Sequence, residues 1–556
     1  MEFIHYYTNS ELEEVLHGWA EAYPGLVRLE QIGESYEHHP LWLLTLTAKA
    51  SGPDDAKPAV WLDANIHASE ITGTTVTLAI ARSLLEGYGV EERITRLLDS
   101  STYYIMPRLN PDGAGWAMAK TPRFVRSGVR PYPFQDKQEG LHEEDIDGDG
   151  RILQMRMLDP NGDWKVSAQN ARLMEKRLPD EQGGTYYRLL SEGHLEQYDG
   201  WTIKEAPPLE GLDFNRNFPF EWRPEGTQPG AGPFPASEPE IRAVVEFVTR
   251  HPNINLAVTY HTYSGVILRP YSTKPDDQMD TSDLWVYQKI GKRGSELTGY
   301  RSVAVYHDFL YHPKEVTTGA FDDWVFDQLG VFAFTIELWD LPTAAGVKER
   351  KFSEWFRDHP YEQDLQILAW ADEHAPGSYV PWYSFNHPQL GPVELGGWDA
   401  MYSWRNPPLG VLAAEVQRNL PFALALGEML PHLALRELKA TALGPGSYHL
   451  NLVLENSGFL STSTSQQGRK LAAMRPLRVE LELGEGQHLA QGKLRQDLGH
   501  LEGRSNKLAV SQVGSFTPTD NQTRVEWVLQ APAGSKLTVK VLCPRGGNIT
   551  RTVELE

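Results

Sequence analysis

The chain has 556 residues, 40% of them hydrophobic, so it can bury a large core and is long enough for roughly two to four domains. Its 74 acidic residues outnumber its 52 lysines and arginines, and the formal charge of -22 opposes sequence-independent binding to nucleic acid or to an anionic membrane. With a single cysteine, Cys543, the chain has neither an intrachain disulfide nor a cysteine-based zinc cluster, so a metal ion would be held by His, Asp or Glu.

The N-terminal segment does not have the features expected of a signal peptide. MEFIHYYTNSELEEVL lacks the basic start and the continuous apolar core of a signal peptide, and no apolar run is long enough to span a bilayer. These features predict a cytoplasmic protein, although a secreted protein in its mature form behind a new Met would look the same.

Strands and helices alternate in the predicted structure of the first 340 or so residues. Apolar residues at helical spacing predict helices at 11–23, 72–88, 241–250 and 321–330. Continuous apolar runs predict strands at 42–48, 59–66, 102–109, 254–263 and 330–338. This alternation is typical of an α/β sheet with helices on both faces.

Two short motifs predict how these elements begin and end. Asn110-Pro111-Asp112-Gly113 predicts a turn that closes the strand 102–109. Ser237-Glu238-Pro239-Glu240 fits a capping box, in which the serine hydroxyl accepts from the backbone while Glu240 reaches back, and it would open the helix 241–250.

The remaining segments divide the chain into domains. Residues 119–210 are polar and contain Pro and Gly, which predicts an insertion on the sheet rather than a part of it. Residues 361–438 are predicted to be helical, with a Pro- and Gly-rich interruption at 376–411. After about residue 440 apolar and polar residues alternate between Gly, Pro and Asn, as in a small β-sandwich. We therefore predict one domain at 1–435 and a β-sandwich at 436–556.

A candidate metal-binding pair follows one of the predicted strands. His67 and Glu70 come directly after the strand 59–66, at the end where open α/β sheets place their sites. The His-x-x-Glu spacing alone is weak evidence, because it recurs at 312–315 and at 359–362. The preceding strand therefore distinguishes the first pair.

Two other polar residues end predicted strands. A catalytic zinc ion requires three protein ligands and an open position, together with a nearby base. His261 ends INLAVTYH and Glu337 ends FAFTIE. Taken alone, His261 is as well explained as a hydrogen-bonded histidine at the sheet edge, and Glu337 as a charge where the chain returns to water.

Five short motifs occur in a fixed order along the chain. They are His67-x-x-Glu70, Asp213-Phe214-Asn215-Arg216-Asn217-Phe218, Ser237-Glu-Pro-Glu240, His261-Thr-Tyr263-Ser, and Asp323-Trp324 followed by Glu337. Jointly they resemble the motifs of the carboxypeptidase A-like zinc metallocarboxypeptidases. The resemblance covers roughly residues 5–430 and implies that the sheet is mixed and mostly parallel, with helices on both faces.

The resemblance implies a zinc site and a catalytic base. By position in the motifs, His67, Glu70 and His261 are the zinc ligands and Glu337 is the general base. Zinc lowers the pKa of its water toward about 7, and a carboxylate can take that proton and deliver it to the leaving amine. Asp213 matches a carboxylate that orients a ligand histidine.

The resemblance also implies substrate contacts. Asn215 and Arg216 match the pair that holds the terminal carboxylate of the substrate, a task for which a planar guanidinium is suited. Tyr263 belongs to the same motif as His261 and is expected to contact the substrate. Arg126 matches the arginine that stabilises the oxyanion, and Arg123 and Arg130 remain alternatives.

In three places the chain departs from the family pattern. Ser69 stands where many relatives have a basic residue for a more distant substrate contact. The family tyrosine that closes over the terminal residue is replaced by Glu315, and Tyr311 slightly upstream is the candidate substitute. Asp322 matches the base of the specificity pocket and would favour a basic C-terminal residue, or it is a first-turn acid that suits a helix N-terminus.

The predicted insertion has two features of its own. It lengthens the separation of Glu70 from His261 and could cover the cleft. It also contains Asp145, Asp147 and Asp149, which follow the spacing of an EF-hand loop around a glycine and are a candidate calcium site. The bidentate glutamate of that loop is replaced by Arg156, so calcium would need another carboxylate such as Asp159; otherwise the segment is a solvated acidic turn.

The sequence thus predicts a zinc-dependent exopeptidase that hydrolyses the C-terminal peptide bond with metal-activated water. Its partner would be a peptide with a free C-terminal carboxylate, with no nucleic acid or membrane, and its oligomeric state is not predicted. One alternative is a zinc-dependent deacylase or cell-wall peptide amidase on the same fold. Another is a non-catalytic binding protein on a peptidase scaffold.

Overall fold

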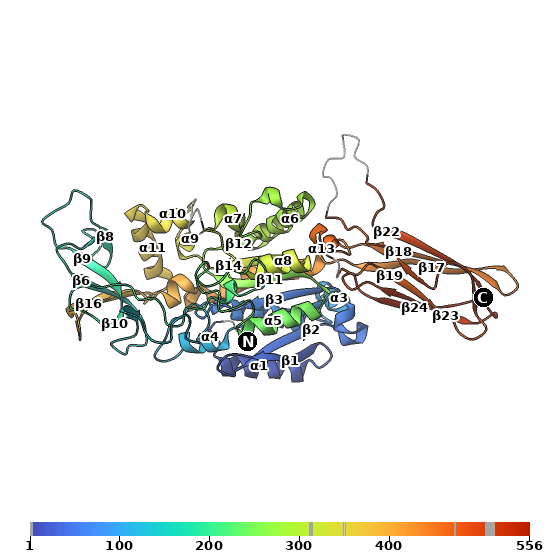
Figure 1. Ribbon diagram of the computed structural model, residues 1–556, viewed down its shortest axis with the longest axis horizontal. Coiled ribbons are helices and arrows are strands. Elements are labelled where there is room, and N and C mark those ends of the chain that lie inside the picture. Colours follow the sequence, from blue (N-terminus) through green and yellow to red (C-terminus); the bar gives the residue numbers. More distant parts are fainter. Residues whose placement is uncertain (1–3, 311–314, 349, 351, 472–473, 506–516) are drawn as a thin grey trace.

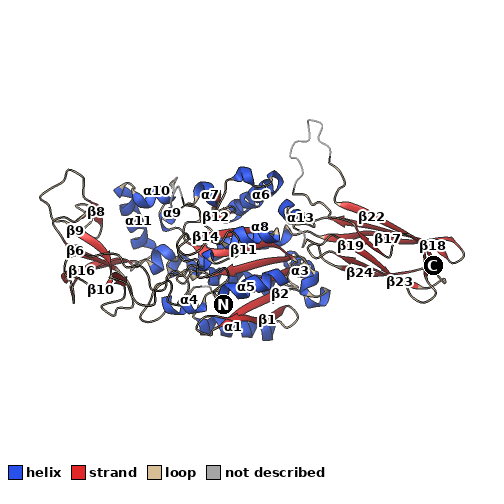
Figure 2. Cartoon of the chain, viewed as in Figure 1, coloured by secondary structure: helices blue, strands red, loops and turns tan. Residues whose placement is uncertain are grey.

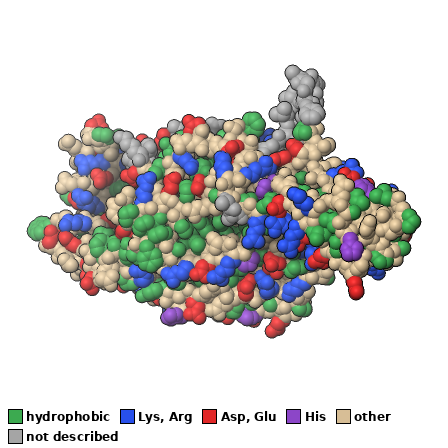
Figure 3. Space-filling model, turned by 45° about the vertical axis from the view of Figure 1, so that its right-hand side comes forward, with side chains coloured by type: hydrophobic (Ala, Val, Ile, Leu, Met, Phe, Trp, Pro, Cys, Tyr) green, Lys and Arg blue, Asp and Glu red, His purple; other side chains and the backbone are tan. Residues whose placement is uncertain are grey.

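The computed structural model describes residues 4–310, 315–348, 350, 352–471, 474–505 and 517–556. An α/β core occupies the middle of an elongated molecule, a small sheet lies at one end, and a β domain extends from the other (Figure 1). On the face drawn in Figure 3, basic side chains lie among acidic ones over most of the surface. Among the described helices, none combines the length and the apolar character needed to cross a membrane.

The core contains an eight-stranded sheet in the order β1-β2-β4-β3-β11-β14-β12-β13. Its strands are β1 (Val27–Glu34), β2 (Pro40–Leu46), β3 (Ala59–Ala64), β4 (Thr102–Met106), β11 (Ile254–Thr262), β12 (Val266–Arg269), β13 (Arg301–Ala304) and β14 (Phe332–Leu338). The pairs β4/β3, β3/β11, β11/β14 and β12/β13 are parallel, whereas β1/β2, β2/β4 and β14/β12 are antiparallel. The prediction of a mixed, mostly parallel sheet is confirmed.

Helices bury both faces of this sheet, as predicted (Figure 2). One apolar cluster joins the sheet to α1 (Asn9–Ala22), α2 (Thr72–Gly87), α6 (Thr281–Thr298) and α12 (Leu409–Glu428). The opposite cluster contains residues of α5 (Pro239–Arg250) and α8 (Phe321–Leu329). Strand β3 contributes Val60 and Leu62 to the first cluster and Trp61 to the second, so every residue of the strand is buried. That two-sided burial explains its continuous apolar sequence.

Other helices lie between the strands of the core or follow the last of them. They are α3 (Glu92–Ser100), α4 (Pro111–Ala117), α7 (Val305–Asp308), α9 (Leu341–Ala344), α10 (Phe352–Arg357) and α11 (Tyr361–His374). The predicted turn at 110–113 is wrong, because these residues begin α4. The Asn110 side chain accepts from the backbone N–H of Gly113 at 2.9 Å, and Pro111 occupies the first turn, where its missing N–H has no cost.

The predicted capping box is also wrong. Helix α5 begins at Pro239, and its N-cap residue, Glu238, makes no side-chain capping bond. The Ser237 hydroxyl donates instead to the Glu238 carboxylate at 2.7 Å. Glu240 does not reach back, because its carboxylate accepts from the backbone N–H of Tyr36 on the neighbouring turn.

The inserted region is built from six short strands. They are β5 (Gly140–Glu143), β6 (Gln154–Leu158), β7 (Trp164–Val166), β8 (Met174–Lys176), β9 (Tyr187–Ser191) and β10 (Gly193–Glu196). Four of them join a distant hairpin, β15 (Tyr379–His387) and β16 (Gly391–Trp398), in a sheet of order β15-β16-β6-β9-β7-β8. None of the six is part of the central sheet, and the stretch 376–411, predicted as an interruption between helices, contains this hairpin.

Two four-stranded sheets form the C-terminal β-sandwich, as predicted from the sequence. One sheet consists of β17 (Leu433–Gly444), β18 (Ser447–Asn456), β22 (Gln522–Gln530) and β20 (His488–Gln491). The other consists of β21 (Arg495–Asp497), β19 (Arg478–Glu482), β23 (Lys536–Leu542) and β24 (Ile549–Glu554). Alternate residues such as Leu450, Trp527 and Val539 fill the core between them.

Candidate metal centre and catalytic cleft

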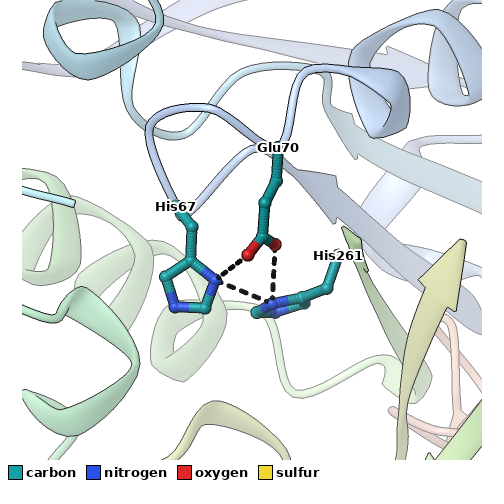
Figure 4. Close-up of side chains that lie close together, drawn as sticks. All are labelled: His67, Glu70 and His261. Atoms are coloured by element: carbon teal, nitrogen blue, oxygen red, sulfur yellow. Dashed lines mark hydrogen bonds and ion pairs between the residues drawn. The ribbon is translucent and has the colours of Figure 1, made fainter. Parts of the chain in front are cut away.

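Parallel pairing of β3 with β11 brings the three predicted metal ligands together. His67 and Glu70 lie in the loop that follows β3, and His261 lies at the carboxyl end of β11. All three are buried, with exposed fractions of 3%, 4% and 1%. Figure 4 shows the two imidazole rings and the carboxylate directed at one another.

The ligand atoms of the three side chains converge on one small volume. Nδ1 of His67 lies 2.9 Å from Oε1 of Glu70 and 3.1 Å from Nδ1 of His261. Oε2 of Glu70 lies 3.3 Å from Nδ1 of His261. Two imidazoles and a carboxylate are the donor set of catalytic zinc sites with three protein ligands, so the arrangement fits Zn²⁺.

Burial supports this assignment for His261. It lowers the pKa of the imidazole to about 4, against the raising effect of Glu70, so the ring is neutral near pH 7, as a metal ligand must be. The Nε2 atom of the same ring is buried and has no hydrogen-bond partner among the described residues.

Asp213 holds the outer edge of His67. Its Oδ1 lies 3.2 Å from Nε2 of His67, and a proton on Nε2 would leave Nδ1 free to bind a metal ion. Asp213 caps the short turn Phe214–Arg216, which fixes the carboxylate in this place. Burial opposes its ionisation, but Arg216, Arg126 and His67 hold its pKa well below the usual range.

Glu337 lies beside the metal ligands because β14 pairs with β11 in parallel, with Glu337 directly opposite His261. Burial, reinforced by the charge of Glu70, raises the pKa of Glu337 well above its usual value. Among the described carboxylates of this cavity, those of Glu70 and Asp213 hydrogen-bond to Arg126, whereas Glu337 does not.

Several of the predicted site residues line a cavity of about 500 Å³. The predicted site residues in its wall are Glu70, Arg126, Asp213, Arg216, Tyr263 and Glu337. Neither Asn215 nor Asp322 lines it, and Tyr311 lies outside the described residues.

The structure gives Asn215 and Asp322 contacts outside the cavity wall. Oδ1 of Asn215 accepts from the backbone N–H of Phe321 at 2.9 Å, which leaves its amide N–H₂ group as a donor. Asp322 is buried, and its carboxylate accepts from the Thr335 hydroxyl at 3.2 Å. Burial raises the pKa of Asp322, and nearby Arg216 partly offsets that rise.

The three arginines that are candidates for stabilising the oxyanion have different partners. Arg126 donates to Glu70 at 3.0 Å and to Asp213 at 3.2 Å. Arg123 pairs with Glu210 at 2.9 Å, and Arg130 pairs with Glu238 at 2.7 Å. Of the three, only Arg126 lies in the wall of the catalytic cavity.

Arg405 is a member of the cavity wall that sequence reasoning missed. It ends the short turn Met401–Arg405, and its Nη1 donates to the hydroxyl of Ser69 at 2.9 Å. No predicted strand or motif surrounds it, so the sequence offered no signal for its place. In the other His-x-x-Glu pair whose histidine the structure describes, 359–362, the imidazole of His359 faces Asp364 at 2.9 Å and belongs to no cluster of metal-binding side chains among the described residues.

Comparisons with known proteins show which family the chain resembles. A family model described as zinc carboxypeptidase matches residues 12–351, and a model of a domain of unknown function matches residues 432–554. The chain is 27% identical over 344 residues to carboxypeptidase B2 of Bos taurus, covering 60% of this chain and 63% of that protein. It is 26% identical over 389 residues to carboxypeptidase A2 of Mus musculus, covering 64% and 71%.

Solved structures of related proteins are also similar. Bovine thrombin-activatable fibrinolysis inhibitor, solved in complex with tick carboxypeptidase inhibitor, is 22% identical, with 67% of this chain and 98% of that one covered and a TM-score of 0.40. Carboxypeptidase A from Helicoverpa armigera is 17% identical, with 67% and 76% covered and a TM-score of 0.40. The chain thus spans less than two thirds of the bovine carboxypeptidase B2 that it matches.

Proposed function

The chain belongs to the zinc carboxypeptidase family, and from this premise we propose that it is a zinc-dependent exopeptidase that removes the C-terminal residue of peptides. The observation that carries the proposal is the convergence of His67, Glu70 and His261 at a cavity whose wall contains Glu70 and Glu337. When bound, zinc supplies a Lewis acid that polarises the scissile carbonyl and acidifies water.

Glu337 is the proposed general base. It takes a proton from the attacking water and later donates it to the leaving amine. Burial of the carboxyl group favours the protonated form that the second step requires. Arg126 lies in the same wall, and we propose that it stabilises the negative charge on the carbonyl oxygen.

Arg216 is the proposed anchor for the free carboxylate of the substrate. Its side chain is 11% exposed and lies in the cavity wall, where a guanidinium can hold a carboxylate through two hydrogen bonds. The amide N–H₂ group of Asn215 supplies a further donor, and Tyr263 contacts the terminal residue. Although Asp322 does not line the cavity, we propose that its negative charge favours basic terminal residues, and the amino acids released from a mixed peptide library test this preference.

The substitution Glu337→Gln tests the mechanism. It should leave the zinc content at one ion per chain, because Glu337 is not a ligand, and should lower kcat by roughly 10²-fold or more, because the amide cannot accept the proton. Zinc by elemental analysis and hydrolysis of free-acid peptides are the measurements. Glu362→Gln, on helix α11 and outside the cavity wall, is the matched control and should retain full activity. Full activity in the Glu337→Gln protein would refute the mechanism.

A deacylase or peptide amidase would use the same zinc ligands without requiring a terminal carboxylate. Peptides that differ only in a free or amidated C-terminus separate these functions. Under our proposal the free acid is cleaved much faster, because the amide cannot form the charge-assisted bonds to Arg216. Binding of peptides without any hydrolysis would instead support a non-catalytic role.

We also propose that the loop containing Asp145, Asp147 and Asp149 binds calcium, since oxygens of the three carboxylates lie within 4.8 Å of one another. Neither Arg156 nor Asp159 completes the set, because Arg156 pairs with Glu394 and Asp159 with Arg188. Asp147→Asn should therefore weaken calcium binding in a calorimetric titration, whereas Asp180→Asn, an exposed change in the same region, should not. No heat of binding in the unaltered protein would refute this proposal.

A further inference from the structure

A second, larger cavity adjoins the catalytic one. Its volume is about 1010 Å³, at the upper end of ordinary ligand sites. Apart from Ser69 and Arg405, every residue of its wall belongs to the inserted region, between positions 121 and 210. The two cavities share Arg126 and Arg405. The insertion therefore forms a groove that continues from the catalytic cavity.

Arg405 stands at the junction of these cavities and is firmly positioned there. The next residue, Asn406, is fully buried, donates to the backbone carbonyl of Ser69 at 2.7 Å and accepts from the backbone N–H of Thr72 at 3.1 Å. These bonds fasten Arg405 to the loop that carries His67 and Glu70. The backbone at Arg405 is thus held beside the proposed metal centre, and its guanidinium reaches the hydroxyl of Ser69.

The partner of this guanidinium is neutral. Arg405 donates to the hydroxyl of Ser69 and lies 5.9 Å from the ring of Phe124, and no ion pair with a described carboxylate accompanies these contacts. In contrast, Arg123 at the same groove is paired with Glu210. A half-buried cation that is left without a counter-charge favours an anionic ligand.

The direction of the groove follows from the opposite end of the catalytic cavity. Arg216 lines the catalytic cavity but not the groove. A peptide whose terminal carboxylate lies at Arg216 therefore passes the metal ligands and reaches the groove at Arg405. Apolar side chains of the groove wall, such as Phe124, Leu141 and Leu190, are suited to contact the substrate residues upstream of the scissile bond.

Building on the proposed function, we propose that this groove binds several substrate residues upstream of the scissile bond and that Arg405 selects an acidic side chain among those nearest to it. The substrates are then oligopeptides with Asp or Glu close to their C-terminus. Arg405 is a specificity-determining residue, contributed by the chain far from every motif of the metal site.

The experiment compares pairs of hexapeptides that have the same terminal residue. The two members of a pair differ only in carrying Glu or Gln at one of the two positions just upstream of the scissile bond. The matching dipeptides are measured alongside them. The zinc-loaded protein should show a kcat/KM roughly tenfold or more higher for the Glu hexapeptide, the effect of one charge-assisted bond, and should cleave dipeptides poorly. Arg405→Gln should reduce the ratio of kcat/KM for the Glu hexapeptide over the Gln hexapeptide to about one, whatever its effect on dipeptides, and Arg405→Lys should retain part of that ratio. Arg495→Gln, on the β-sandwich, is the control.

A second variant tests the groove without touching Arg405. Ala206→Trp places a large ring in the groove wall and should slow cleavage of hexapeptides but not of dipeptides. An equal loss for all peptides in Arg405→Gln would overturn the proposal, because it would mean that Arg405 only supports the Ser69 loop. If no peptide is cleaved, the proposed function fails, and titration of the Glu337→Gln protein with the Glu and Gln hexapeptides still decides whether the groove distinguishes them.

Discussion

The carboxylate of Asp213 interacts with three side chains of the site. One of its oxygens faces His67, the other accepts from Arg126, and Arg216 lies 3.8 Å away. The same group therefore contacts a proposed metal ligand and two cations that are proposed to act on the substrate. Because a low-dielectric site strengthens each of these interactions, loss of the charge would disturb all three together.

Glu240 is buried by tertiary contacts, and its effect on the stability of the fold depends on pH. It is 1% exposed, Oε1 accepts from Tyr36, and Oε2 has no partner among the described residues. Burial, reinforced by Asp112 and Glu238, raises its pKa to about 8. An unfolded glutamate has a pKa near about 4.3, so between these values the folded chain binds a proton that the unfolded chain has released.

The stability due to Glu240 is thus fully present below about pH 4 and is lost as the pH rises toward 8. Glu240→Gln removes this dependence and keeps an oxygen for Tyr36. In scanning calorimetry, the melting temperature of the variant minus that of the unaltered protein should increase by a few degrees as the pH rises from 5 to 8. Glu246→Gln, on the exposed side of α5, should give a constant difference. A constant difference for Glu240→Gln as well would show that the buried carboxyl does not titrate in this range.

At the scale of the element, the sequence predicts the three strands that carry the site residues but not the segments that contact and support them. Strands β3, β11 and β14 are buried on both faces, so their apolar runs are visible in the sequence and their ends mark His67, His261 and Glu337. Hairpin β15–β16 is only partly buried and pairs with β6 from far along the chain, so its sequence lacks a continuous apolar run. Arg405 and the partner of Glu240 depend on similarly distant contacts, which local patterns do not encode.

Helix α4 supports the metal centre by close packing. A Cβ atom at Gly113 would lie 2.6 Å from Cβ of Ala68, which stands between the proposed ligands His67 and Glu70, and 2.9 Å from the carbonyl of Ser127. The ligand loop and the first turn of α4 therefore touch, and only a residue without a side chain fits between them. This contact explains a glycine in the first turn of a helix, where it otherwise costs stability.

Gly113→Ala should consequently displace the ligand loop and weaken zinc binding by about tenfold, an effect typical of changes just outside a metal's ligands. Competition with a chromophoric chelator measures the affinity. Gly115→Ala is a matched control in the same helix, since its Cβ would meet only the Asn9 side chain at 3.4 Å. An affinity equal to that of the control would show that the loop accommodates the methyl group freely.

At the scale of the whole molecule, the two ends of the site strands have different neighbours (Figure 1). The carboxyl ends of β3, β11 and β14 carry the site, beside the groove of the inserted region. Their amino ends meet the β-sandwich: the N–H of Asn548 donates to the carbonyl of Ala56 at 2.8 Å, just before β3, and Asn255 near the start of β11 donates to the carbonyl of Arg545 at 3.1 Å. The sandwich therefore braces the strands from the end opposite to the chemistry.

Arg545 makes the third of these contacts and provides the test. It is 6% exposed and donates to the carbonyls of Leu329 at 2.6 Å and Gly330 at 3.3 Å, just before β14, and to the Thr464 hydroxyl at 2.9 Å. Arg545→Ala leaves the carbonyl of Leu329 without this donor, at a cost of about 1–3 kcal/mol before relaxation, whereas the carbonyl of Gly330 keeps the bond from the Ser465 hydroxyl at 2.7 Å. The melting temperature of the catalytic part should fall by several degrees in scanning calorimetry, with zinc content unchanged.

Arg551→Ala is the control for this change, because Arg551 is exposed on β24 and donates only to the carbonyl of the adjacent Thr550 among the described residues. The two variants remove the same charge from the same domain and differ in whether the guanidinium enters the catalytic part. Equal melting temperatures would therefore show that the sandwich is attached without stabilising its neighbour. A lower melting temperature for Arg545→Ala alone would establish that the sandwich holds the amino end of β14, the strand whose other end presents Glu337.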